Sequence, residues 1–208
     1  MRLGKKAMEA LQAEVTGRLL PGNELVVAGP VALKGTSLIA KEKKEMLREH
    51  FSEGFLRTSA SLYRDFGAGE KPEKSAAWEK AGNAGATALL ALGEGGFLSA
   101  LWKMAEASSV GLDVDFRKVP VRQETIEICE IFDLNPYRLL SDGAILIGIP
   151  GGEALVQEYH RMGLMAAVIG QTNSGNDRLL YSGESARYLE RPVEDELKKV
   201  IGNFQEVF

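Results

Sequence analysis

One stretch of this chain constrains its fold more than any other, because it joins a strand, a glycine turn and a helix. Residues 86–92 are almost wholly apolar and predict a buried strand, residues 93–96 read Gly-Glu-Gly-Gly, and residues 97–109 predict a helix. Such a turn presents free backbone N–H groups at the helix N-terminus, where an anion can bind. The only charged residue of the turn, Glu94, is itself an anion and can satisfy the helix N-terminus on its own.

The glycine turn has two interpretations. Its backbone N–H groups, from Gly93, Glu94, Gly95 and Gly96, can form an anion or small-metabolite site. Alternatively, the turn needs small residues so that the strand and the helix pack closely. The sequence leaves both interpretations open.

Composition limits the classes of function. A chain of 208 residues that is 45% hydrophobic can bury a sizeable core, and it favours one domain (residues 23–208) behind a helical appendage (residues 1–22). A formal net charge of −4 argues against a nucleic-acid surface, which needs an excess of clustered Lys and Arg. Cys129 is the single cysteine, and its apolar surroundings predict a buried, unreactive thiol. The chain lacks a long apolar run, so we expect a cytoplasmic protein with no membrane partner.

Helical and strand periods alternate along the chain. Helices are expected over residues 4–19, 34–50, 52–65, 97–109 and 121–132, around Trp78, from 152 through Tyr159, and from about Pro192 onward. Strands are expected over residues 25–28, 86–92, 111–116, 144–149, 164–171 and 178–182, the last two joined as a hairpin by the turn at 173–177. This order predicts an α+β fold with a mixed sheet covered by helices, and residues 67–75 form the most loop-like segment.

Five segments, in this order, resemble signature stretches of one family: residues 105–112, 119–122, 129–136, 140–143 and 167–171. From about residue 24 to 190 the chain is similar to the C-terminal domain of the AIR synthase (PurM) superfamily, and within it to the HypE hydrogenase maturation factors. The pair Gly29-Pro30 followed by Lys34-Gly35 resembles an upstream family loop that usually reads Gly-Pro, then His-Gly. The resemblance implies a layered α/β/α mixed sheet, partly ferredoxin-like, with an extra N-terminal helix.

The chain departs from this family at several positions. Active members usually carry a first domain with adjacent aspartates that bind metal and ATP, whereas this sequence has no Asp-Asp pair and about 23 residues before its first matching strand. Where the family commonly shows Asp-Pro-Thr-Arg-Gly-Gly, residues 91–96 read Ala-Leu-Gly-Glu-Gly-Gly. A glutamate in place of that arginine repels a nearby phosphate by about 1 kcal/mol or more. Lys34 replaces the usual histidine, and the C-terminal cysteine tail of HypE is missing.

The candidate ligand-binding residues are therefore Gly93, Glu94, Gly95, Gly96, Lys34 and Gly35, with no catalytic residue, no metal site and no cofactor expected. Asp113 and Asp115 share a strand face and are interpreted as either a metal-binding or acid-base pair or, with better support, an exposed edge facing water. His50, His160, Arg122, Ser108 and Ser109 lie near helix ends, where structural roles explain them.

We expect a non-catalytic or regulatory binding module for a small metabolite or a protein, assembled as a homo-oligomer. The alternative is the C-terminal half of a split ATP-dependent enzyme whose nucleotide-binding subunit is a separate chain. In relatives with two domains, the first covers apolar surface on the second. Here residues 4–19, self-association or both are expected to cover it.

Overall fold

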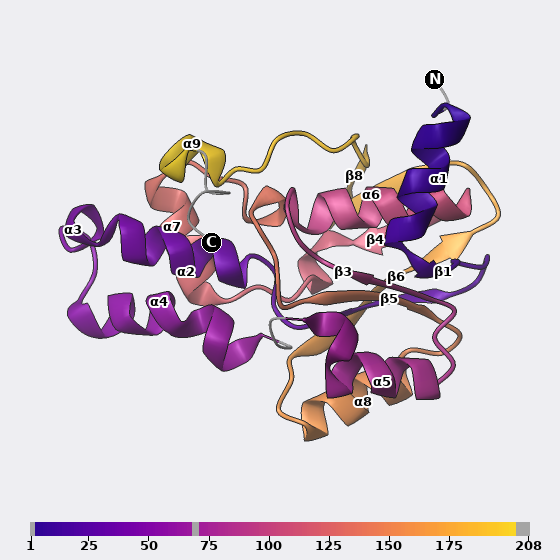
Figure 1. Ribbon diagram of the computed structural model, residues 1–208, viewed down its shortest axis with the longest axis horizontal. Coiled ribbons are helices and arrows are strands. Elements are labelled where there is room, and N and C mark those ends of the chain that lie inside the picture. Colours follow the sequence, from indigo (N-terminus) through magenta and orange to yellow (C-terminus); the bar gives the residue numbers. More distant parts are fainter. Residues whose placement is uncertain (1–2, 68–70, 203–208) are drawn as a thin grey trace.

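An eight-stranded mixed sheet forms the centre of the computed structural model, which describes residues 3–67 and 71–202 (Figure 1). The strands are β1 (Thr16–Gly17), β2 (Glu24–Ala28), β3 (Ala88–Ala91), β4 (Gly111–Asp115), β5 (Ile145–Ile149), β6 (Ala166–Asn173), β7 (Arg178–Ser182) and β8 (Ser185–Tyr188). Their order across the sheet is β1-β3-β5-β2-β6-β4-β7-β8. Neighbouring strands run antiparallel except β4 and β7, which are parallel.

The central strands are buried on both faces, as their continuous apolar sequences predict. In β2, Leu25 and Val27 belong to one apolar core, and Val26 and Ala28 belong to the core on the other face of the sheet. Every residue of β5 is buried. The expected strand at 144–149 is thus confirmed at the centre of the sheet.

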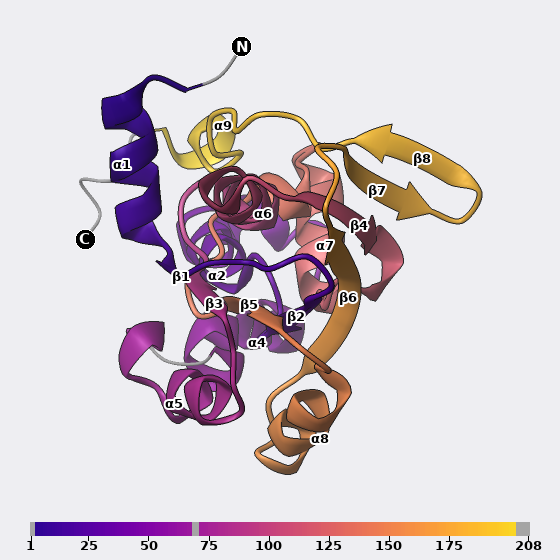
Figure 2. The ribbon, with the colours of Figure 1, turned by 90° about the vertical axis from the view of Figure 1, so that its right-hand side faces the viewer.

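Helices cover both faces of the sheet and one end of it. Figure 2 shows α1 (Lys5–Glu14) and α6 (Gly96–Ser108) on one face, with α5 (Ala76–Asn83) and α8 (Glu153–Arg161) on the other. The end group consists of α2 (Leu33–Glu42), α3 (Lys44–Leu47), α4 (Glu53–Phe66), α7 (Gln123–Ile131) and α9 (Lys198–Ile201), and these helices share a third apolar core. Three 3-10 turns, η1 (Pro72–Lys74), η2 (Phe116–Lys118) and η3 (Pro136–Arg138), complete these elements. The layered α+β architecture and the extra N-terminal helix are confirmed.

The N-terminal helix is shorter than its sequence pattern suggests. It ends at Glu14, after which the chain extends and β1 adds to the sheet beside β3. Gly17 permits this pairing, because its φ is +77° and a Cβ there would lie 2.1 Å from the Thr87 carbonyl oxygen. Leu11 and Leu19 still bury their side chains in the core next to α6. The expected helix at 34–50 is likewise divided at Lys43 into α2 and α3.

The hairpin expected between residues 164–171 and 178–182 is wrong, because β4 lies between β6 and β7 and pairs with both. Gly111 makes the insertion possible, since a Cβ there would lie 2.7 Å from the Asp177 carbonyl oxygen. β7 instead forms a hairpin with β8, around Gly183 with a φ of +63°. All four residues of β8 are exposed, so its sequence lacks the apolar alternation from which a strand can be predicted.

The helix expected from about Pro192 is also wrong in extent. Only α9 is helical there, and the residues before it cross the molecule without regular structure. Val193, expected on the buried face, is 52% exposed, whereas Leu197 is fully buried in the core of the end helices. The backbone of this crossing segment is held by Asp195 instead, as described below.

Candidate functional site

Three loops meet at the edge of the sheet where β2 and β3 end and β5 begins. They are residues 29–35, which run into the first turn of α2, residues 92–96, which end at the first residue of α6, and residues 139–143. The Ser141 amide donates to the Gly93 carbonyl oxygen at 3.1 Å, and the Ser141 hydroxyl accepts a hydrogen bond from the Ala32 amide at 2.9 Å. All six predicted site residues lie in the first two loops, and the third loop joins them.

The glycine turn requires glycine for packing. Gly95 and Gly96 have φ values of +79° and +66°, in the left-handed region that costs other residues about 1–2 kcal/mol. A Cβ on Gly96 would lie 2.7 Å from the Leu139 carbonyl oxygen and 2.8 Å from that of Tyr137. The backbone of η3 therefore leaves no space for a side chain at this point, which supports the packing interpretation of the turn.

A carboxylate of the chain itself occupies the turn. Asp195 Oδ2 accepts a hydrogen bond from the Gly95 amide at 2.6 Å, and Oδ1 accepts from the amides of Leu140 at 3.2 Å and Leu197 at 2.9 Å. Asp195 is only 2% exposed. Burial raises the pKa of this carboxyl, the three amide donors oppose that rise, and the charge of Glu94 adds to it. Asp195 thus provides the anion that the free N–H of Gly95 would otherwise attract.

Glu94 does not cap the helix that follows it. The N-cap residue of α6 is Gly95, whose amide donates to Asp195, and the Glu94 side chain is 46% exposed. Its carboxylate lies 3.5 Å from Lys198 Nζ, which is also 3.6 Å from Glu194. The sequence-based expectation that Glu94 satisfies the helix N-terminus is therefore wrong, because its carboxylate pairs with Lys198 of α9.

Lys34 and Gly35 contact the same joining loop. Lys34 Nζ lies 2.7 Å from Asp142 Oδ2 and 5.5 Å from the centre of the Tyr63 ring. Asp142 Oδ1 in turn would lie 3.3 Å from a Cβ placed on Gly93. Gly35 donates its amide to the Leu140 carbonyl oxygen at 3.0 Å. The structure therefore brings the Lys34-Gly35 pair and the glycine turn together through residues 139–143.

The hollow beside the glycine turn is small. It measures about 210 Å³ and is lined by Gly93, Glu94, Gly96, Ser99 and Lys103, among others. Lys103 is paired with Glu14 of α1 at 2.7 Å. Ligand pockets usually measure roughly 300–1,000 Å³. This hollow is therefore smaller than most small-molecule sites.

The remaining sequence candidates have structural partners. Asp113 and Asp115 share a face of β4, but that strand is interior, so the expected edge position is wrong. Asp113 accepts hydrogen bonds from Asn173 at 2.8 Å and from the Tyr181 hydroxyl at 3.2 Å. Asp115 pairs with Arg117 at 3.2 Å. The described residues contain no group of three or more His, Cys, Asp or Glu able to hold a metal.

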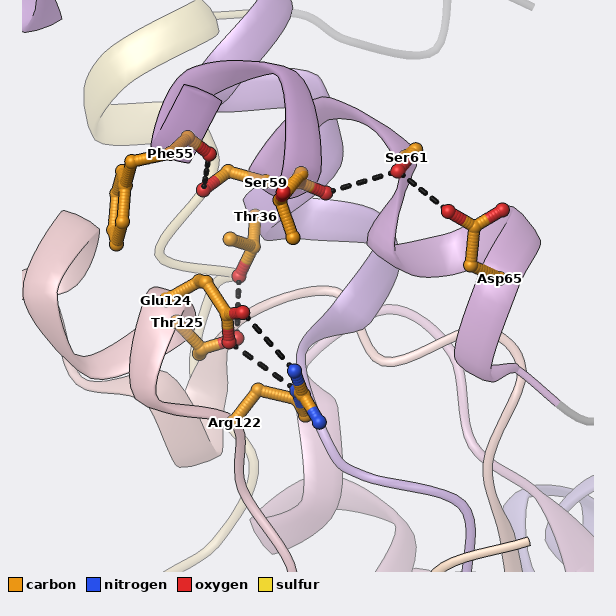
Figure 3. A network of polar contacts seen from close by, with 9 residues as sticks. Thr36, Phe55, Ser59, Ser61, Asp65, Arg122, Glu124 and Thr125 are labelled. Atoms are coloured by element: carbon orange, nitrogen blue, oxygen red, sulfur yellow. Dashed lines mark hydrogen bonds and ion pairs between the residues drawn. The ribbon is translucent and has the colours of Figure 1, made fainter. Parts of the chain in front are cut away.

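Arg122 forms a salt bridge beside the end helices. Its guanidinium pairs with Glu124 at 3.0 and 3.2 Å, next to the hydrogen bond of 3.0 Å between Thr36 and Thr125 (Figure 3).

Ser108 and His160 also form structural hydrogen bonds. The hydroxyl of Ser108 accepts a hydrogen bond from the Leu19 amide at 2.9 Å, and the His160 ring forms one with the Ala166 carbonyl oxygen at 2.9 Å.

Cys129 is buried as expected. It is 2% exposed, and burial, with the charge of Glu196, raises the pKa of its thiol to about 12. A thiol with this pKa carries almost no thiolate at neutral pH, so Cys129 is unreactive.

The sequence analysis did not identify two residues of the site around the glycine turn, Asp142 and Asp195. Asp142 lies in the signature stretch at 140–143 and could have been singled out there as a charged residue in a turn. Asp195 carries no such signal, because it lies 100 residues from Gly95 in the chain.

These loops and this sheet define the chain as an AIR synthase related C-terminal domain: the model of the family described as "AIR synthase related protein, C-terminal domain" matches residues 21–182, and the chain belongs to that family. Within it the chain is close to HypE. It is 28% identical to the carbamoyl dehydratase HypE of Rhodobacter capsulatus over 116 residues, which is 52% of this chain and 34% of that protein. The resemblance seen in the sequence is confirmed.

Solved structures support the same fold. E. coli HypE has a TM-score of 0.63 at 19% identity, covering 88% of this chain and 53% of that one. A thiamine-monophosphate kinase from Stenotrophomonas maltophilia has a TM-score of 0.57 at 17% identity, covering 82% and 53%. The chain thus spans about half the length of these structures and about a third of the curated relatives. Within the described residues, no helix is long and apolar enough to cross a membrane.

Proposed function

We propose that this domain is a non-catalytic or regulatory binding module whose glycine turn holds no nucleotide phosphate. The observation that carries this proposal is the position of Asp195, whose buried carboxylate accepts the Gly95 amide. A backbone donor that is already satisfied by an internal anion offers nothing to a phosphate. The hollow next to it also carries the carboxylate of Glu94.

Electrostatics supports the same conclusion. A phosphate entering the turn would meet the negative charges of Glu94 and Asp195, and each repels it by about 1 kcal/mol or more at close range. The nearby cations are already engaged, Lys198 by Glu94 and Glu194, and Lys103 by Glu14. Phosphate sites normally supply cations and free N–H groups instead.

Nucleotide titration followed by NMR tests the proposal. We expect no saturable shift of the Gly93, Gly95 and Gly96 amide signals when Mg²⁺ and ATP are added to the purified protein, and no metal-dependent ATP turnover. The Glu94→Arg variant, which restores a cation, is the matched comparison. Turnover by the wild-type protein that is lost on blocking the turn with a bulky residue at Gly95 would overturn the proposal.

The module is proposed to act by binding a small ligand or a protein partner in the cytoplasm, as a homo-oligomer. One solved relative is a HypE–HypF complex, with a TM-score of 0.60, which supports a role in protein assembly. In this chain α1 covers part of the face of α6, through Leu11 and Gln12, whose side chain donates to the Ala107 carbonyl oxygen. Light scattering after size-exclusion chromatography, with and without residues 1–20, tests self-association. An unchanged, soluble monomer would contradict it.

A second candidate is one half of a split ATP-dependent enzyme. It is favoured by the coverage of the solved relatives, since the chain matches about half of a HypE chain whose structure was solved in complex with ATP. In that case a separate nucleotide-binding chain should co-purify with this protein, and ATP turnover should need both. If no such chain co-purifies, the split enzyme is contradicted and the binding module remains the proposed function.

A further inference from the structure

A positively charged surface lies away from the glycine turn, in a furrow between α2 and α4. The furrow measures about 1,140 Å³. Its lining includes one carboxylate, Glu53, and six cationic side chains: Lys34, Lys41, Lys44, Arg57, Arg64 and Lys71. The whole chain carries a formal net charge of −4, so this positive surface is a local concentration and does not follow from composition.

The cations stand in two rows, one on each helix. Lys34 and Lys41 are seven residues apart on α2, and Arg57 and Arg64 are seven residues apart on α4. Seven residues make two helical turns, so the charges of each row lie on one face, about 10 Å apart along the axis. Both rows line the same furrow, because the two helices pack side by side.

Apolar side chains line the furrow between the two rows of cations. Leu38 of α2 and the buried Leu56 and half-buried Ala60 of α4 form part of its lining. Tyr63 adds an aromatic ring at the end where Lys34 lies. Ser61 of α4 also lines the furrow, and its hydroxyl donates to Asp65 at 2.6 Å (Figure 3). The furrow therefore combines positive walls with a surface suited to an organic body.

The positive charge is only partly neutralised. Three of the cations have carboxylate partners: Lys34 with Asp142 at 2.7 Å, Lys44 with Glu53 at 3.2 Å, and Arg64 with Asp65 at 2.9 Å. Within residues 3–67 and 71–202, Lys41, Arg57 and Lys71 form no ion pair. Like charges gathered in one furrow repel one another and disfavour the folded state. A bound anion would remove that cost.

We propose that the furrow between α2 and α4 binds a small organic molecule that carries two or more phosphate or carboxylate groups. Its volume is close to the upper end of small-ligand pockets, roughly 1,000 Å³. The guanidinium of Arg57 presents a planar set of donors that matches the oxygens of either group. The rows end after two helical turns, which fits a compact ligand better than an extended chain.

This site is independent of the function proposed above. It shares only Lys34 with the cluster around the glycine turn, and Lys34 faces Asp142 there. An anion in the furrow should shift the amide signals of Ser37 and Ser61 and leave those of Gly95 and Gly96 unchanged. Success or failure at one site can therefore be read separately from the other.

Isothermal titration of the full chain, in the presence of a chelator, tests the proposal with tripolyphosphate, ATP and citrate as probes. Tripolyphosphate or ATP, or citrate if carboxylates are preferred, should bind saturably and more weakly as sodium chloride is raised. The double variant Lys41→Gln with Arg57→Gln should bind at least about tenfold more weakly, because it removes two charge-assisted contacts. Both side chains are exposed, so the fold should be unaffected.

The matched control is Lys6→Gln with Arg18→Gln, which removes the same charge from exposed positions at the N-terminal end of the chain. Its affinity should equal that of the wild-type protein. The proposal is overturned if no small anion binds saturably, or if both double variants lose affinity equally. Tighter binding of polyglutamate or of a short oligonucleotide than of every small anion would also overturn it, and would identify a surface for a macromolecule.

Discussion

The glycine turn and the furrow between α2 and α4 lie on either side of Lys34 and have opposite electrostatic character. At the turn, the N–H of Gly95 is satisfied by a buried carboxylate of the same chain, and Glu94 adds a second negative charge. In the furrow, Lys41 and Arg57 have no carboxylate partner in the described part of the chain. The turn thus has an internal anion, whereas the furrow has positive charge without one.

This difference shows that the motifs shared with a family do not by themselves indicate where a domain carries unpaired charge. The signature stretch at 140–143 contacts the glycine turn, because the Ser141 amide donates to the Gly93 carbonyl oxygen. Close packing and the Asp195 carboxylate together explain the backbone geometry of the turn, while Lys41 and Arg57, unpaired within the described residues, lie outside the family motifs.

The largest expected effect is at Gly96, where the packing interpretation can be broken directly. Gly96→Ala should lower the free energy of unfolding by about 3 kcal/mol, from a left-handed φ and from overpacking against the backbone at Leu139 and Tyr137. Urea unfolding measures the loss. The control is Gly163→Ala, which has a φ of +76° and no atom within 4 Å of the added Cβ, so only the φ cost of about 1 kcal/mol remains. Equal losses at both positions would contradict the packing argument.

The next effect concerns the internal anion. Asp195→Ala should cost about 2 kcal/mol, because three buried amide donors lose their acceptor, while the removal of a desolvated charge offsets part of that loss. Urea unfolding checks the value, with Glu194→Ala as an exposed neighbour expected to change stability by less than about 0.5 kcal/mol. If Asp195→Ala were as mild as Glu194→Ala, the turn would not depend on its carboxylate.

Much of the fold could be predicted where a segment carries its own periodic signal. The strand at 144–149 is apolar throughout, the helix after Gly96 is apolar over most of its length, and both form. The insertion of β4 between β6 and β7 could not be predicted, because strand partners are chosen by contacts between distant residues. The exposed strand β8 lacks any apolar pattern.

The site could be predicted only as far as its motifs extend. The Lys34-Gly35 pair and the glycine turn were singled out from the sequence, and both contact residues 139–143. The role of Asp195 was hidden because the apolar spacing of Leu197 and Val200 indicates a helix through the segment. Apolar spacing does not indicate that the Asp195 side chain accepts hydrogen bonds from backbone amides far away in the sequence.

A smaller effect is expected from the pair that joins the two regions. Lys34 and Asp142 are 21% and 29% exposed, so their interaction is only partly screened by water. A double-mutant cycle with Lys34→Met and Asp142→Asn should give a coupling free energy of about 1 kcal/mol. The fully exposed pair Lys5–Glu9, 3.9 Å apart, serves as the comparison and should give close to zero. Equal couplings would mean that burial adds nothing to the strength of the Lys34–Asp142 pair.

The smallest effect is the pH dependence at Asp195, and it tests how poorly the turn receives a negative charge. Burial raises the pKa of this carboxyl in the folded protein above its value of about 3.9 in the unfolded chain, and the charge of Glu94, which is paired with Lys198, adds to the rise. The folded state therefore binds the proton of Asp195 more tightly than the unfolded state does. The contribution of this protonation to the free energy of unfolding is fully present below about pH 4 and is lost as the pH rises through the folded pKa. Relative to Asp195→Asn, the wild-type protein should lose stability as pH rises across this window, whereas Glu194→Gln should show no such change. Urea unfolding at a series of pH values measures both. If the wild-type protein instead gains stability over Asp195→Asn as pH rises, the three amides outweigh burial, and the turn is a site that stabilises anions.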